Sequence, residues 1–235
     1  MLSDHGIPAI ICEDRRQETV MYNIFLTGAK RTGKSSLIRK CLVPYRDALG
    51  GFSSQRLLDV SGKIIGYRIT DAADFEVEKL YEPSLPGIFM LRGIVDRACY
   101  TMENTIDLSV FRDHVTKMLI PEDQTLIMLL DEIGGVEMLD PEFRSRLYEL
   151  LESDMPCIGV LKENKDSANN AAFSSEAASL RSENLMLQEF LDNDPSSCLI
   201  CLTDCGPLFS QDATEVSAEA ERMIRDFLSQ IVRTN

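Results

Sequence analysis

The stretch GAKRTGKS, Gly28–Ser35, follows directly on the apolar run YNIFLT of residues 22–27. The run consists largely of residues that favour strands, and apolar residues recur at helical spacing over residues 37–42. The sequence therefore predicts a strand, a glycine-bearing loop and a helix in succession. In this order the loop presents its backbone N–H groups at a helix N-terminus, where they can bind a phosphate.

The loop satisfies the pattern G-x-x-x-x-G-K-[ST], which is typical of nucleotide-binding phosphate loops. Glycines let the backbone curl around a phosphate, the ammonium of Lys34 can reach the β- and γ-oxygens, and the hydroxyl of Ser35 can bind Mg²⁺. The position of the motif between a predicted strand and a predicted helix argues against a chance match. The residues expected to cradle the phosphates are Gly28, Ala29, Lys30, Arg31, Thr32, Gly33, Lys34, Ser35 and Ser36.

A phosphate loop needs a second carboxylate to complete the Mg²⁺ shell, at the end of a neighbouring strand. The run TLIMLL, residues 125–130, is nearly all apolar, as expected of a strand buried on both faces, and it stops at Asp131. We predict that Asp131 helps to hold Mg²⁺ and that Glu132 orients or deprotonates an attacking water. Alone, an Asp-Glu pair would be better explained as a solvated loop start, but its combination with the phosphate loop favours the functional interpretation.

Strands and helices alternate along the chain, which predicts an α/β fold of the P-loop NTPase type with a mainly parallel sheet and helices on both faces. Two β-prone runs within residues 53–71 predict a β-hairpin insertion. Helices are expected over residues 107–119, after the N-cap Asp140, over residues 180–191 and at the C-terminus. Further strands are expected at LPGIFML, PCIGVLK and SCLICLT.

The domain organisation follows from the same periodicity. Residues 1–21 show no clear period and are predicted to be an N-terminal arm, and residues 22–235 are predicted to form one P-loop domain. Within it, residues 162–195 diverge from the expected pattern. The Asn-, Ala- and Ser-rich segment Glu163–Glu176 in this region predicts a mobile loop or lid.

Composition restricts the partners and the location. The chain has 24 Lys and Arg against 38 Asp and Glu, a net charge of −14. This negative charge would repel a phosphodiester backbone, so we do not expect nucleic acid as a binding partner. No apolar run is long enough to span a bilayer, and the N-terminus does not resemble a secretory signal. The odd number of 7 cysteines suggests reduced thiols, so we expect a cytoplasmic protein without a membrane partner. Cys198, Cys201 and Cys205 are better explained as structural thiols than as zinc ligands.

Several segments together resemble the family of small nucleoside triphosphatases that includes a human cancer-related member and archaeal and bacterial relatives. The segments are GAKRTGKSSLI, GGFSSQRLLDVSGKIIGYRI, LPGIFML, LLDEIGGVEMLDPEF and PCIGVLK, and the resemblance covers about residues 22–161. It implies Mg²⁺-dependent hydrolysis of nucleoside triphosphates such as ATP and GTP to diphosphates and phosphate, with broad base tolerance. The resemblance also includes Arg56 in the hairpin, whereas Gly135 stands where members commonly carry a basic residue.

Other functions use the same residues. A nucleotide or small-molecule kinase shares the loop and the metal, but the region Glu163–Asn184 lacks the arginine cluster expected of a kinase lid. A switch GTPase would read guanine with N-K-x-D, and here the aspartate of Asn164-Lys165-Asp166 comes one residue early. A nucleotide-dependent assembly factor stays open as a third class. Arg31 and Arg56 are candidates for stabilising transition-state charge, with a solvated surface arginine as the equal alternative.

Overall fold

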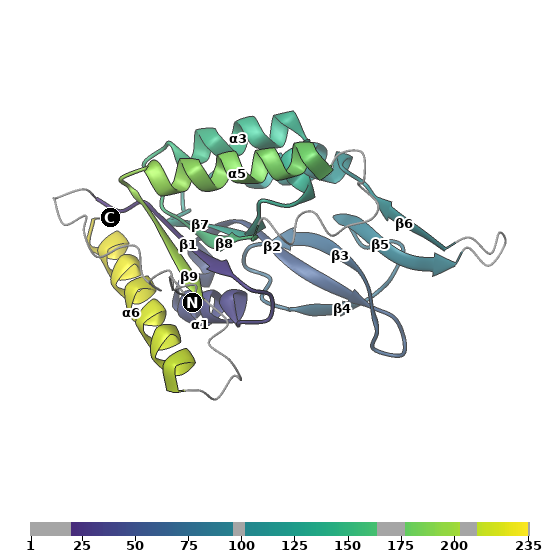
Figure 1. Ribbon diagram of the computed structural model, residues 1–235, viewed down its shortest axis with the longest axis horizontal. Coiled ribbons are helices and arrows are strands. Elements are labelled where there is room, and N and C mark those ends of the chain that lie inside the picture. Colours follow the sequence, from purple (N-terminus) through teal and green to yellow (C-terminus); the bar gives the residue numbers. More distant parts are fainter. Residues whose placement is uncertain (1–19, 96–101, 164–176, 203–210, 235) are drawn as a thin grey trace, which may run out of the picture.

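The computed structural model describes residues 20–95, 102–163, 177–202 and 211–234. These residues form one sheet in the order β6-β5-β3-β2-β7-β8-β1-β9, with β4 beside β2 (Figure 1). The strands are β1 (Asn23–Gly28), β2 (Leu49–Leu58), β3 (Ile64–Asp71), β4 (Glu78–Leu80), β5 (Ile88–Val95), β6 (Met102–Ile106), β7 (Ile127–Ile133), β8 (Cys157–Leu161) and β9 (Ser197–Leu202).

Helices cover both faces of the parallel part of the sheet. Figure 1 shows α1 (Lys34–Leu42) and α6 (Gln211–Thr234) on one face, and α3 (Pro141–Leu151) and α5 (Ala177–Asn193) on the other. Pairs β1–β8, β1–β9, β2–β7, β7–β8 and β2–β4 are parallel. The predicted α/β fold with a mainly parallel sheet is therefore confirmed. The shorter helical segments are η2 (Val43–Ala48), the π-helical turn η3 (Phe111–Val115), α2 (Thr116–Met118) and η4 (Val136–Leu139).

The sheet separates two hydrophobic clusters. In β1, Ile24 and Leu26 pack into the cluster that contains α1 and α6, whereas Phe25 packs into the cluster that contains α3 and α5. Successive side chains of a strand point to opposite faces, so a strand covered on both sides needs an unbroken apolar run. This is why the run before the phosphate loop does not alternate with polar residues.

The hairpin insertion extends the sheet beyond its helices, to the right in Figure 1. Strands β2 and β3 form the predicted antiparallel hairpin, and β3–β5 and β5–β6 continue the antiparallel pairing. The first hairpin strand begins at Leu49, earlier than the predicted Ser53, because its first residues pair in parallel with β7.

The structure tests some of the other predicted elements and leaves others outside the described residues. The side chain of Asp140 accepts hydrogen bonds from the N–H groups of Glu142 and Phe143, which confirms the N-cap of α3. The helix expected over residues 107–119 is present over residues 109–118, and its middle is the π-helical turn η3, which leads into α2. Most of the N-terminal arm and of the predicted lid, residues 1–19 and 164–176, lies outside the described residues. Within the described part of the chain, none of the helices is both long and apolar enough to cross a bilayer.

Candidate functional site

The two glycines of the phosphate loop sit where the backbone requires them. Gly28 ends β1 with a φ of 117°, and a Cβ there would lie 2.1 Å from the carbonyl oxygen of Leu202 on β9. Gly33 is the N-cap of α1 with a φ of 86°, in the left-handed region. Between them, Arg31 also has a positive φ of 67°. The loop is therefore tightly curled, as the motif predicts.

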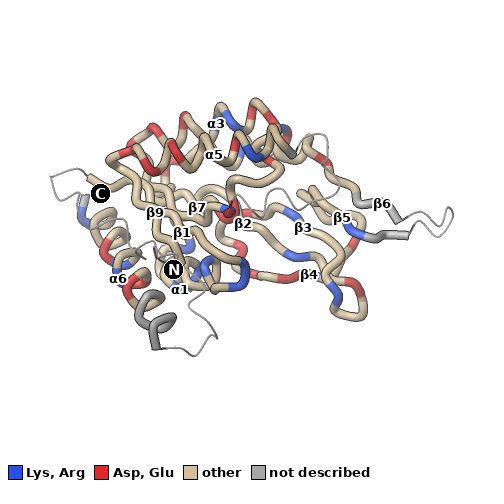
Figure 2. The backbone as a smooth tube through the Cα atoms, in the orientation of Figure 1, with Lys and Arg blue, Asp and Glu red and all other residues tan. Residues whose placement is uncertain are grey.

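The side chain of Lys34 folds back over the phosphate loop. Its Nζ donates to the carbonyl oxygens of Gly28 at 2.8 Å and Ala29 at 2.5 Å, and to the hydroxyl of Thr32 at 3.2 Å. The positive charge thus lies at the mouth of the loop, where the terminal phosphates of a nucleotide would bind. Lys30 and Arg31 are exposed on the same loop, which is basic although acidic residues recur along α3, α5 and α6 (Figure 2).

The structure brings Ser35 and Asp131 together from positions 96 residues apart in the sequence. The hydroxyl of Ser35 donates to Oδ1 of Asp131 at 2.9 Å, and Nη2 of Arg39 donates to Oδ2 of the same carboxylate at 2.7 Å. Burial and the nearby Glu132 carboxylate raise the pKa of Asp131, and Arg39 and Ser35 offset part of that rise. Asp131 is thus held by Ser35 of the phosphate loop and by a third residue, Arg39.

That third residue, Arg39, is one that the sequence analysis missed. It is 8% exposed and also donates to the Ser53 hydroxyl and the Ser54 carbonyl, both at 3.1 Å. A signal was present, because Arg39 comes one helical turn after Ser35 and so lies on the same side of α1, among apolar residues. A charged residue in that position of a buried helix face usually has a partner.

Glu132 lies in an irregular part of β7. The pairing of β7 with β8 shifts register between Leu130 and Ile133, and Glu132 has a positive φ of 68°. Strand β7 therefore does not stop at Asp131, as the sequence suggested, but continues through a bulge to Ile133. The bulge buries the Asp131 carboxylate and leaves the Glu132 side chain 43% exposed. Strained backbone of this kind is concentrated at functional sites.

A lysine outside the predicted site completes the group of charges. Lys162 Nζ lies 3.9 Å from Oε2 of Glu132 and 3.9 Å from Oε2 of the buried Glu137. A Cβ at Gly135 would lie only 2.5 Å from Lys162 Nζ. The ammonium of Lys162 thus occupies the space beside position 135.

Arg56 is not brought to the described cluster. It is paired with Glu78 at 3.1 Å on the neighbouring β4, and both side chains are about half exposed. Its assignment as a charge-stabilising residue stays a prediction.

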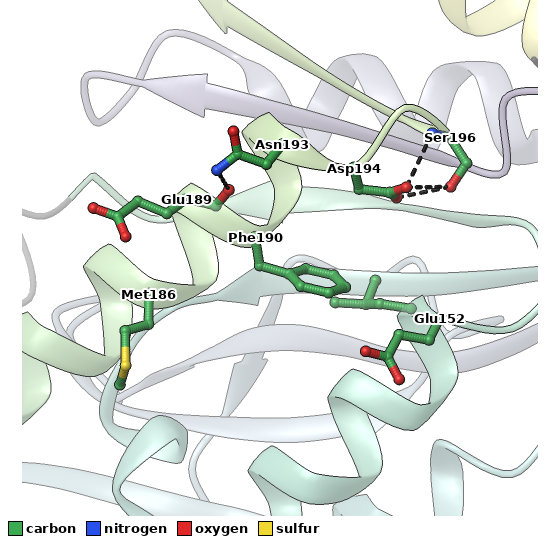
Figure 3. Close-up of a pocket in the computed structure, with 8 residues that line it drawn as sticks. Glu152, Met186, Glu189, Phe190, Asn193, Asp194 and Ser196 are labelled. Atoms are coloured by element: carbon green, nitrogen blue, oxygen red, sulfur yellow. Dashed lines mark hydrogen bonds between the residues drawn. The ribbon is translucent and has the colours of Figure 1, made fainter.

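A hollow lined by described residues lies at the end of the parallel strands opposite to the phosphate loop. It has a volume of about 520 Å³ and lies between the end of α3 and the C-terminal half of α5 (Figure 3). Phe190 and Glu152 face each other across it, and Asp194 binds Ser196 at its rim. Because Ser196 precedes β9, this hollow is at the amino ends of the strands, away from the phosphate loop.

Comparison with known proteins agrees with this geometry. The model of a family described as NTPase matches residues 23–184. The chain belongs to this NTPase family. Two relatives are nucleoside-triphosphatases THEP1: the one from Thermotoga petrophila is 29% identical over 143 residues, which cover 61% of this chain and 73% of the relative. The one from Thermotoga sp. strain RQ2 is 27% identical over 143 residues, 61% of this chain and 75% of the relative.

The fold of this NTPase is also that of a solved relative. The structure of a human cancer-related nucleoside triphosphatase matches with a TM-score of 0.52 and 14% identity, over 87% of this chain and 97% of that one. The resemblance drawn from the sequence motifs is thus confirmed.

The cysteines of the last strand behave partly as expected. Cys198 is buried and Cys201 less so, in the alternating pattern of β9, which confirms that they face opposite sides. Cys41, Cys157 and Cys201 are free thiols, whereas Cys198 is disulfide-bonded. The expectation of reduced thiols is therefore wrong for Cys198.

Proposed function

We propose that this protein is a Mg²⁺-dependent enzyme that hydrolyses nucleoside 5'-triphosphates to diphosphates and phosphate. The observation that carries the proposal is the hydrogen bond between Ser35 of the phosphate loop and Asp131 of β7. It joins the two side chains that P-loop enzymes use around their metal ion. The family membership and the THEP1 relatives support the same activity.

The residues present suit Mg²⁺. The Ser35 hydroxyl and the Asp131 carboxylate offer oxygen atoms within 2.9 Å of one another, and oxygen is the ligand that this ion prefers. Bound there, Mg²⁺ would neutralise charge on the β- and γ-phosphates. Arg39 keeps the Asp131 carboxylate in place through a contact of 2.7 Å.

Other groups at the carboxyl ends of the strands would bind the phosphates and activate the attacking water. Lys34 places its ammonium beside the loop carbonyls, where it can move to phosphate oxygens with little change in position. The half-exposed carboxylate of Glu132 can accept a hydrogen bond from a water and take its proton as the water attacks. Backbone N–H groups of the loop hold the phosphates against the N-terminus of α1.

Broad base tolerance is part of the proposal. The roles assigned above involve the phosphates, the metal ion or the attacking water, and none of them involves the base. The hydrolysis of every nucleoside triphosphate uses these same groups. We therefore expect ATP, GTP, CTP and UTP to be turned over at rates within about tenfold of each other.

The first test measures phosphate release from these four nucleotides, with and without Mg²⁺, for the parent and three variants. No molecule that could accept the phosphate, other than water, is present. Glu132→Gln should bind nucleotide with the parent affinity and lose about 100-fold or more in kcat, because the general base is removed. Lys34→Ala should lose nucleotide binding, and Glu142→Gln, an exposed glutamate of α3, should match the parent. Tight binding without phosphate release by the parent would contradict hydrolysis and favour a kinase or a switch.

A further inference from the structure

The location of Lys162 follows from strand order. Strand β8 lies between β7 and β1, and Lys162 is the residue directly after β8. Leu26 of β1 pairs with Val160 of β8, so Gly28 and Lys162 each come two residues beyond that pair. On the other side, the Lys162 N–H donates to the carbonyl of Ile133 at 2.8 Å. Lys162 therefore lies between the phosphate loop and the end of β7 that carries Glu132.

Its two acidic neighbours differ in how firmly they are held. The Glu137 side chain is 4% exposed, and its Oε1 accepts the N–H of Gly135 at 2.5 Å. The Glu132 side chain is 43% exposed and sits on the strained bulge. Burial alone would lower the pKa of Lys162, but Glu137, Glu132 and Asp131 raise it above its usual value, so the ammonium persists at neutral pH. A fixed carboxylate on one side thus anchors a cation that faces a freer carboxylate on the other.

The surrounding backbone is shaped to receive this ammonium. A Cβ at Gly135 would lie 2.5 Å from Lys162 Nζ and 2.8 Å from Oε2 of Glu137, although the φ of −106° suits any residue. The glycine therefore provides space rather than backbone freedom. The buried side chain of Asn184 donates to the carbonyls of Gly134 at 2.7 Å and Lys162 at 3.3 Å, which joins the β7 and β8 ends to α5.

We propose that Lys162 is a positioning residue of the hydrolysis, a role that rests on the function proposed above. Its ammonium, anchored by Glu137, restrains the Glu132 carboxylate on the side of the phosphate loop, so that Glu132 meets the attacking water in a reactive orientation. Misplacing a reactive group by about 1 Å can cost about 100-fold in rate, so such a restraint has a measurable effect.

The test compares Lys162→Ala and Lys162→Arg with the parent and with Lys117→Ala, a control lysine on α2. Lys162→Ala should lower kcat by about 10- to 100-fold and leave the affinity for a non-hydrolysable triphosphate within about threefold. Lys162→Arg should regain most of kcat, because its guanidinium can still bridge the two carboxylates. Thermal unfolding of each variant shows whether it is folded at the assay temperature.

A second variant displaces the ammonium without removing any charge. Gly135→Ala puts a methyl group into the space of Lys162 Nζ and should lower kcat as Lys162→Ala does. In the Lys162→Ala background most of this loss should be absent, because only the close approach of the methyl group to Oε2 of Glu137 remains. Independent, multiplying losses in the double variant would contradict the proposal.

The outcomes separate this inference from the proposed function. If the parent releases phosphate from no triphosphate, both are wrong. If the parent is active and folded Lys162→Ala keeps the parent kcat, only the positioning role is wrong. A loss of nucleotide affinity with unchanged kcat would also overturn it, because Lys162 would then bind the phosphates in the ground state.

Discussion

Arg39 shows what a single buried charge does in this molecule. It is almost completely buried, and its guanidinium joins α1 to β2 and β7 by binding the Ser53 hydroxyl, the Ser54 carbonyl and the Asp131 carboxylate. A buried ion pair adds little stability compared with apolar residues, but removing one partner leaves the other charge buried and uncompensated. We therefore expect Arg39 to fix the orientation of Asp131.

We predict that Arg39→Met destabilises the protein by about 3 kcal/mol, because the Asp131 carboxylate stays buried without its cation. Urea unfolding measures the change, with Arg222→Met as the control, since Arg222 and Glu219 form an exposed pair on α6. The double variant Arg39→Met/Asp131→Asn should recover part of the loss. A double variant that is less stable than both single variants would refute the assigned role.

At the scale of elements, the junction of β1, the loop and α1 depends on two glycines for different reasons. Gly28 needs both its positive φ and its lack of a side chain, because β9 runs directly beside it. Gly33 needs only the positive φ, since a Cβ there would have no atom of the described residues within 4 Å. The two glycines of one motif should therefore tolerate substitution unequally.

Gly28→Ala should cost about 3 kcal/mol, because a clash with the Leu202 carbonyl adds to an unfavourable φ. Gly33→Ala should cost about 1 kcal/mol from backbone strain alone. Chemical denaturation of the two variants beside the parent gives the comparison. Equal losses would contradict the claim that β9 restricts Gly28.

The same junction shows how far local sequence predicts an element. The strand, the loop and α1 could be predicted because their signals, apolar periodicity and glycine spacing, lie within a few neighbouring residues. The bulge at Glu132 could not, because it depends on how β7 pairs with β8. Likewise, the contact of Lys162 with Glu137 depends on which strand ends are neighbours in the sheet. The sequence located Asp131 and Glu132, but it did not identify Arg39 and Lys162, the basic residues that pair with them.

In the whole molecule, the carboxyl ends and the amino ends of the parallel strands differ in function. The phosphate loop lies at the carboxyl ends of the strands, and polar contacts around Asn23 stabilise their amino ends. Its side-chain amide donates to the Leu151 carbonyl at 3.0 Å and to the Ser197 hydroxyl at 3.0 Å, and it approaches Asp194 at 3.4 Å. These contacts join β1 and β9 to the end of α3, so the helices on one face are fixed at the edge opposite to the site.

We predict that Asp194→Asn destabilises the protein at pH 7 by about 1 kcal/mol, a value that allows for solvent screening. Burial by itself would raise the pKa of Asp194, but hydrogen bonds from Ser197, Ser196 and Asn23 lower it below the usual value. A lowered pKa in the folded state means that this stabilisation is present above the unfolded pKa of about 3.9 and is lost as the pH falls through the folded pKa.

Urea unfolding of the parent and Asp194→Asn at pH 7 and near pH 3 checks this prediction. The difference between them should shrink at the lower pH, because the unfolded parent then binds a proton at Asp194 more readily than the folded parent does. Asp154→Asn, at an exposed position after α3, should match the parent at both pH values. A difference that stays constant with pH would show that the charge of Asp194 is not what stabilises this edge.

The inward turn of Lys34 has a consequence for which anions the loop accepts. The carbonyl oxygens of Gly28 and Ala29 already solvate its ammonium, so they compete with any phosphate for the same protons. An anion that displaces these carbonyl oxygens must therefore gain other contacts, with the N–H groups of the loop and with the Mg²⁺ ion proposed above. A triphosphate chain can do so at several points, whereas a single inorganic phosphate has one. We therefore expect the loop to prefer a triphosphate chain to a single phosphate, whatever base the nucleotide carries.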